Sequence, residues 1–228
     1  MSLRSFFRRS MKECADSHPD VDPWGKMWAR TDKWDRQHAN SAELLQCEPD
    51  RDRLDQAYEL HSAGEREGAF AIWRELAGQE SVWAMIELGR GYEYGGAVPI
   101  DLDMAECWYE RALVGGSQIA MLYYARLAAR RGDYVACEEA LSVGVRQGWA
   151  PALFWMAWYR VKQAGSKQTY RAIRPMLRSA AAQGHPGARM ILANFMVRGK
   201  YGPLGMPLGF LRMLRTSIAD IRNKEASV

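Results

Sequence analysis

Residues 83–117 read WAMIELGRGYEYGGAVPIDLDMAECWYERALVGGS, and this stretch decides the fold. Its first part places Ala84, Leu88 and Tyr92 four residues apart, which predicts one face of an amphipathic helix. A loop containing glycines and a proline follows, and Gly115-Gly116 ends the second part. That second part carries its own helical face at four positions, Ala105, Trp108, Tyr109 and Ala112. The stretch therefore predicts two helices that pack against each other.

The same pattern recurs along the chain. A glycine that ends a helix is followed four residues later by an alanine at three junctions: Gly116 and Ala120, Gly148 and Ala152, Gly184 and Ala188. Before the first of them, Glu80 takes the place of the glycine, four residues ahead of Ala84. Successive alanines are thus 36, 32 and 36 residues apart, and small residues recur inside the first helices at Gly89, Ala125, Ala157 and Ala193. Periods of this length are typical of helical repeat proteins.

The junctions divide the chain into repeats. We expect units near 54–81, 82–117, 118–149, 150–185 and 186–205, preceded by an extension over 1–53 and followed by a capping helix over 206–228. One helix pair has too little apolar surface to form a core alone, so neighbouring pairs must stack. Terminal repeats usually need a cap with a polar outer face. The prediction is an all-α fold of about five helix pairs with an extra N-terminal helical segment.

Residues 82–117 closely resemble the Sel-one-like repeat (SLR) family, a longer-looped branch of the tetratricopeptide repeats (TPR). The resemblance lies in AMIELGRGY, the Gly-Gly pair of the loop and WYERALVGG. Residues 151–184 share mainly the SAAAQG helix end, whereas units 54–80 and 119–148 are more similar to plain TPRs. The resemblance implies a right-handed α-α superhelix, a solenoid whose first helices line the concave face.

The extension over residues 1–53 lies outside the repeats. Residues 3–12 predict a short basic amphipathic helix, which would dock on the first repeat or lie on a membrane surface. Trp24, Trp28 and Trp34 follow nearly one helical stripe. They would either pack in the core or place a tryptophan-bearing arm in the groove of the superhelix.

Charge is distributed unevenly along the chain. Residues 54–149 hold 8 basic and 15 acidic residues, a net charge of −7, whereas residues 150–228 hold 13 basic and 2 acidic residues, a net charge of +11. The basic half could be a solvated face or a landing site for an acidic partner. No apolar run is long enough to span a membrane. The four cysteines, Cys14, Cys47, Cys107 and Cys137, form no close pair, which favours a reducing cytoplasm.

Motifs for catalysis are missing from the sequence. The histidines, His18, His38, His61 and His185, are scattered and form no metal-ligand pair. Asp16, His18, Asp20 and Asp22 cluster on one loop, but turn formation explains them equally well. Neither a phosphate-binding loop nor a nucleophile motif occurs. We therefore expect neither enzymatic activity, nor a cofactor, nor a metal site.

The repeat register predicts which first-helix residues face the groove. Partner contacts are expected at eight positions, Arg90, Arg126, Arg130, Phe154, Trp158, Lys162, Asn194 and Arg198. Arginines form paired hydrogen bonds with carboxylates, and aromatic rings supply stiff apolar area. Packing between repeats is the alternative for the aromatic members, and simple solubility is the alternative for the arginines.

These features favour a scaffold or adaptor that binds an acidic segment of another protein. Since SLR proteins suit such a role, an immunity or inhibitor protein that neutralises a toxin enzyme is a sharper form of the same hypothesis. Nucleic-acid binding by the basic half is a further alternative, although no recognised motif supports it. Self-association between the acidic and basic halves is a third.

Overall fold

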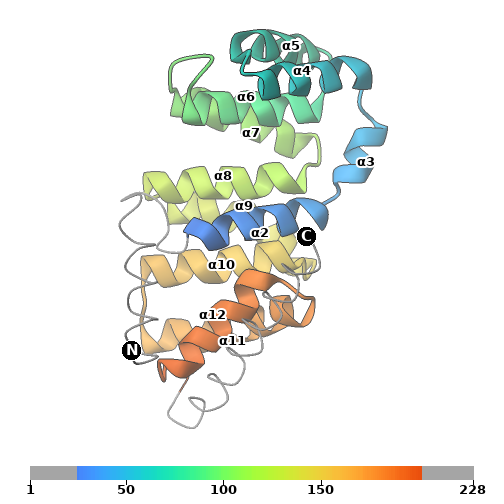
Figure 1. The fold of residues 1–228 in the computed structure, drawn as a ribbon. Helices are drawn as coiled ribbons and strands as arrows, with labels where there is room; N and C mark the ends of the chain where they lie inside the picture. The colour runs from blue at the N-terminus through green and yellow to red at the C-terminus, as the bar shows by residue number, and fades with distance from the viewer. Residues whose placement is uncertain (1–24, 202–228) are drawn as a thin grey trace, which may run out of the picture. The chain divides into compact units, whose positions relative to one another are not determined.

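The computed structural model describes residues 25–201, and all the regular structure there is helical (Figure 1). The helices are α2 (Gly25–Gln37), α3 (Ser41–Gln46), α4 (Arg51–Ala63), α5 (Arg66–Gly78), α6 (Val82–Tyr94), α7 (Leu102–Val114), α8 (Gln118–Arg131), α9 (Tyr134–Arg146), α10 (Ala150–Gln163), α11 (Lys167–Ala182) and α12 (Pro186–Val197). The predicted all-α helical repeat fold is confirmed. Among these helices, none is long and apolar enough to cross a membrane.

The chain forms two compact units. One comprises residues 38–159, and the other combines residues 1–37 with 160–228. In the 38–159 unit each helix from α4 to α9 packs on the next along the chain, as stacked repeats require. In the other unit α12 packs against both α11 and α2. The predicted basic helix over 3–12, the loop with Asp16 and His18, and the capping helix over 206–228 lie outside the described residues.

Each junction between repeats turns on one residue in the left-handed backbone region. Gly116, Gly148 and Gly184 have φ of 84°, 72° and 95°. The next residue donates its backbone N–H to a carbonyl of the preceding helix at 2.9–3.1 Å, as in Ser117 to Ala112. Glu80 adopts the same conformation with φ of 63°, which is the only positive φ of a non-glycine residue in the described chain. The turn therefore demands this conformation even where glycine is missing.

A buried cap follows the left-handed residue. Ser81 and Ser117 are almost fully buried, and each Oγ accepts the backbone N–H of the alanine three residues later, at 3.1 Å. Those alanines, Ala84 and Ala120, are completely buried. The four-residue spacing thus joins a helix end, a helix start and a core position in one motif. At the third junction Trp149 stands in the cap position, and its indole Nε1–H donates to the His38 carbonyl at 3.0 Å.

The fourth junction carries a histidine as its cap. His185 is fully buried, and its Nδ1 accepts the backbone N–H of Ala188 at 3.1 Å. Because Nδ1 accepts, the ring hydrogen resides on Nε2, which lies 3.0 Å from the buried carboxylate of Asp35 on α2. The ring of Trp34 meets the imidazole edge-on with centroids 4.9 Å apart. Helix α2 of the N-terminal extension is therefore fixed to the last described repeat.

The small residue in the first helix of the second repeat is required by close packing. A Cβ at Gly89 would lie 2.5 Å from the ring of Tyr109 on α7. Tyr109 is completely buried, so its ring has no room to move away. The close approach of α6 and α7 therefore depends on this glycine.

Substituting Glu80 by glycine should stabilise the protein. A side chain in the left-handed region costs about 1 kcal/mol, which glycine removes. The lost ion pair between Glu80 and Arg111, at 3.3 Å, is largely exposed and contributes little. We expect the free energy of unfolding in urea to rise by about 0.5–1 kcal/mol. The matched control is Gly116→Ala, where a Cβ meets no atom within 4 Å. It should lower the same free energy by about 1 kcal/mol through backbone strain alone, and equal signs for the two variants would contradict the assignment.

Substituting Gly89 by alanine should destabilise the protein through overpacking. The new methyl group would overlap the Tyr109 ring, which costs about 1–3 kcal/mol in a packed core. Thermal or urea unfolding measures the loss. Gly78→Ala at the end of α5 adds the same methyl group where no atom lies within 4 Å. This control should leave stability unchanged or slightly higher, and a similar loss in both variants would refute the packing argument.

Candidate protein-binding surface

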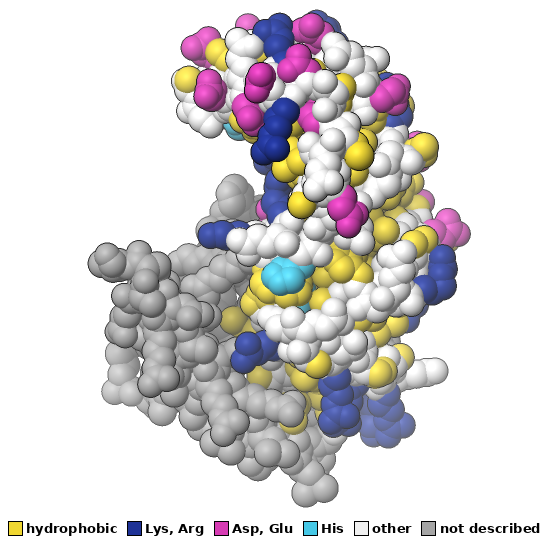
Figure 2. All heavy atoms as spheres, turned by 90° about the vertical axis from the view of Figure 1, so that its right-hand side faces the viewer, with side chains coloured by type: hydrophobic (Ala, Val, Ile, Leu, Met, Phe, Trp, Pro, Cys, Tyr) yellow, Lys and Arg dark blue, Asp and Glu magenta, His cyan; other side chains and the backbone are white. Residues whose placement is uncertain are grey.

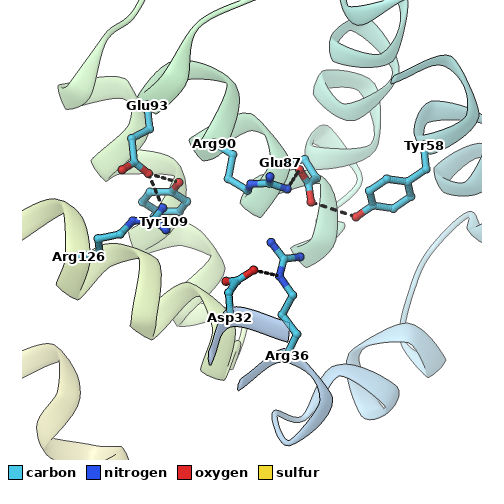
Figure 3. Close-up of polar contacts among 8 residues, drawn as sticks. All are labelled: Asp32, Arg36, Tyr58, Glu87, Arg90, Glu93, Tyr109 and Arg126. Carbon is cyan, nitrogen blue, oxygen red and sulfur yellow. Dashed lines mark hydrogen bonds and ion pairs between the residues drawn. The ribbon is translucent and has the colours of Figure 1, made fainter. Parts of the chain in front are cut away.

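Two of the predicted groove arginines bind one buried carboxylate. Glu93 lies in the last turn of α6 and is 1% exposed. Its Oε2 accepts from Arg126 Nη2 at 2.8 Å and from the Tyr109 hydroxyl at 2.8 Å, and its Oε1 accepts from Arg130 Nη1 at 2.8 Å. Figure 3 shows the carboxylate facing Tyr109 of α7 and Arg126 of α8. Glu93 thus links three consecutive helices.

The electrostatics of this cluster favour the ionised carboxylate. Burial alone would raise the pKa of Glu93, but the charge of Arg126 and the hydrogen bonds from Arg126, Tyr109 and Arg130 outweigh it. The pKa of Glu93 therefore lies below its ordinary value. Burial and the nearby Glu93 charge raise the pKa of Tyr109, so the phenol stays neutral and donates its hydrogen. Two guanidinium groups around one carboxylate leave a net charge of +1.

The two arginines of this cluster differ in exposure. The side chain of Arg126 is 13% exposed, and its guanidinium also stacks over the ring of Tyr123, 4.7 Å from the centroid. The side chain of Arg130 is 43% exposed. Arg126 therefore has mainly a structural role, while Arg130 presents charge to solvent.

Arg90 is held by a second buried carboxylate. Glu87 on α6 is 4% exposed. Its carboxylate accepts a hydrogen bond from Arg90 Nη1 at 2.8 Å and another from the Tyr58 hydroxyl of α4 at 3.2 Å (Figure 3). The Arg90 side chain remains 37% exposed. The same figure shows the Asp32–Arg36 pair of α2, a 3.1 Å ion pair within one helix. A buried acidic residue that orients an exposed arginine therefore occurs twice on α6.

A small cavity of about 100 Å³ adjoins Arg90. His61, Arg66, Trp73 and Glu87 also line it. Trp73 is 4% exposed, and its indole Nε1 has no hydrogen-bond partner among the residues that the structure describes. The cavity is large enough for one small polar group, and two arginines and one glutamate contribute to its lining.

The aromatic residues predicted for the groove are in the core. Phe154 and Trp158 are 3% and 9% exposed, and the neighbouring ring of Trp155 packs edge-on against Phe154 at 4.8 Å. Packing between repeats is the alternative expected for these aromatic residues, and their burial is compatible with it. A role of Phe154 and Trp158 as partner contacts stays a prediction. Lys162 and Arg198 are exposed and Asn194 is half-buried, and all three belong to the unit that contains α11 and α12.

The repeat register did not predict that two carboxylates, those of Glu87 and Glu93, hold the arginines. Glu87 and Glu93 lie in the largely apolar helix VWAMIELGRGYEY, where a buried acidic residue needs a cationic partner. Acidic residues within an apolar helix therefore indicate buried ion pairs, although the sequence does not show which cations form them. In the described part of the chain, no three His, Cys, Asp or Glu side chains gather where they could hold a metal ion.

Replacing Glu93 by glutamine should weaken the fold and change its response to acid. Removing one partner of a buried ion pair costs about 3–5 kcal/mol, which urea unfolding near neutral pH measures. The lowered pKa means that the stability contributed by Glu93 is complete above its ordinary value of 4.5 and is lost as pH falls through the folded-state pKa. The variant should therefore lose less further stability in acid than the original protein. The control Glu80→Gln removes an exposed partner of Arg111 and should change little, whereas equal acid responses in the Glu93 variant and the original would contradict the assignment.

Comparison with known proteins supports the fold. Neither a protein-family model nor a curated protein matches the sequence. Among solved structures, a Sel1 repeat protein from Oxalobacter formigenes matches with a TM-score of 0.51 and 22% sequence identity, over 65% of this chain and 63% of that one. A protective antigen of uropathogenic Escherichia coli strains that displays an SLR fold matches with a TM-score of 0.43 and 15% identity, over 71% of this chain and 44% of that one. With its recurring helix pairs and junctions, the chain has the Sel1-like repeat fold.

Proposed function

We propose that this chain is a protein-interaction scaffold that binds an acidic segment of another protein on the first helices of its 38–159 unit. The observation that carries the proposal is the pair of buried carboxylates on α6. Glu87 and Glu93 hold Arg90 and Arg130 by 2.8 Å ion pairs while 37% and 43% of those side chains stay exposed. Arginines fixed in this way lose little conformational entropy when they bind a carboxylate.

The cavity beside Arg90 adds a place for one partner side chain. It is lined by Arg66 and Arg90 and by the buried indole of Trp73. A carboxylate that enters it would accept hydrogen bonds from groups held by the packed helices. A hydrogen bond to a charged group contributes about 1.5–3 kcal/mol, so this contact would add to the attraction at the exposed arginines. The proposal assigns the chain no catalytic step.

Neutralising the two exposed arginines should weaken partner binding. A partner is first captured with the tagged chain and identified by mass spectrometry, and its affinity for purified variants is then measured by calorimetry. We expect Arg90→Gln combined with Arg130→Gln to reduce affinity about tenfold or more. Affinity for the original chain should also fall as salt rises, because exposed charges are screened.

Two controls separate binding from folding. Arg146→Gln removes an exposed charge from α9, outside the first helices, and should leave affinity unchanged. Thermal unfolding of the double variant checks that the protein still folds without the two arginine side chains. We expect it to fold, because Glu87 keeps its hydrogen bond from Tyr58 and Glu93 keeps its hydrogen bond from Arg126. Unchanged affinity in a folded double variant would rule out this surface as the binding site.

A further inference from the structure

A large basic cavity lies in the unit that contains α11 and α12. Its volume is about 710 Å³, which is within the range of ligand-binding clefts. Six side chains dominate its wall, Lys167, Tyr170, Arg171, Arg174, Lys200 and Tyr201. Four of these are cationic, and no acidic residue contributes to the lining. The cavity is therefore strongly positive.

The charges on α11 form one stripe. Lys167, Arg171, Arg174 and Arg178 follow one another at intervals of four, three and four residues, which places them on one helical face. A neighbouring face of the same helix buries Tyr170, Ile173, Leu177 and Ala180. Like charges at such spacings destabilise a helix by a few tenths of a kcal/mol each, about 0.2–0.5. Neither α11 nor any other part of residues 140–219 contains an Asp or Glu that could offset them.

These cations differ from the arginines of α6, α7 and α8. Every arginine on those three helices forms an ion pair with a carboxylate: Arg90, Arg111, Arg126, Arg130 and Arg131. Lys167, Arg171, Arg174 and Lys200 form none with any residue between 25 and 201. Figure 2 shows Lys and Arg side chains over α11 and α12 without Asp or Glu among them. The positive charge of this cavity is thus not neutralised within the described chain.

Ring contacts hold two of the cations at the cavity wall. The Arg174 guanidinium lies over Tyr201 and the Lys200 ammonium lies over Tyr170, each 5.0 Å from the ring centroid. Arg174 Nε and the Tyr201 hydroxyl are buried atoms without a hydrogen-bond partner in the described residues. Such groups lose hydration on burial without gaining a hydrogen bond in return. The wall therefore carries cations that the tyrosine rings hold in place.

We propose that this cavity binds a carboxylate-rich, extended segment of another protein. Four cations match several carboxylates, and the volume admits a short stretch of chain. Nucleic acid fits less well, because base binding needs open aromatic faces. Tyr170 is 9% exposed, and cations already cover both rings. A second copy of this chain also fits less well, since its acidic groups project from folded helices such as α4 and α5, at the top of Figure 2. The cavity shares no lining residue with the surface around Arg90 and Arg130, so each proposal can fail or succeed independently of the other.

The test is fluorescence anisotropy of a labelled oligoglutamate peptide with the full chain at low and near-physiological salt. An oligoglutamine peptide of equal length is the uncharged comparison. We expect the oligoglutamate peptide to bind and the oligoglutamine peptide not to bind. The double variant Arg171→Glu with Arg174→Glu should reduce the affinity for oligoglutamate about tenfold or more. Arg189→Glu, an exposed charge on α12 outside the cavity, is the matched control and should leave affinity unchanged. If the double variant fails to fold, Lys200→Glu changes another cation of the same wall, and it should also reduce the affinity for the oligoglutamate peptide.

Three results would overturn the proposal. The first is peptide affinity that does not change in folded cavity variants. The second is a single-stranded oligonucleotide that binds more tightly and displaces the peptide, which would favour nucleic acid. The third is self-association through the cavity, which would favour a second copy as the occupant. In light scattering the molecular mass would then rise with protein concentration. It would fall when the oligoglutamate peptide is added or when Arg171→Glu and Arg174→Glu are combined. Loss of partner binding in the variant Arg90→Gln with Arg130→Gln would concern only the surface of the 38–159 unit. It would not affect the conclusion drawn from oligoglutamate binding to the cavity.

Discussion

The structure depends on a turn of the backbone that only a left-handed residue can make. Each helix pair ends on such a residue, and the next N–H returns to the helix just completed. At three of the four described junctions the following side chain starts a new helix from inside the core, where it has access to no water. A helix start that is buried needs its own acceptor, so Ser81, Ser117 and His185 supply one. Because the same few residues end one helix, start the next and fill the core, the four-residue spacing at each junction is fixed, while the loops inside each pair vary in length.

That frame changes what charged residues can do. Inside the 38–159 unit, carboxylates on α6 are buried and bind arginines from the helices that pack on it. Burial makes those carboxylates expensive unless they are paired, so the pairs fix the arginines in space. On α11 the same residue type has no acidic neighbour and is placed by packing and by tyrosine rings. The chain thus presents arginine in two ways, one with its charge partly neutralised and one with its charge available.

Much of the fold could be predicted from sequence because its signals are local. The spacing of Gly116, Gly148 and Gly184 from the alanines that follow them reports directly on turns and buried positions. The candidate surface could be predicted only in part. Arg126 has the right position on the first helix of its repeat, yet its partner Glu93 comes from 33 residues earlier and no periodicity links the two. Phe154 and Trp158 show the same difficulty, since a helical stripe of aromatic residues is compatible with a groove and with a core. The contact of α2 with α12 has no sequence signature at all.

The pairing of Asp35 with His185 has a consequence for how the protein is made. The two residues are 150 positions apart, so one unit takes helices from both ends of the chain. The residues between them, 38–159, contact mainly their neighbours along the chain and can fold as soon as each helix pair leaves the ribosome. Helix α2, although translated early, cannot form its contacts with α12 until that helix has been synthesised. The first helix of the described chain is thus among the last to complete its contacts, and during that interval Asp35 lacks the histidine that pairs with it.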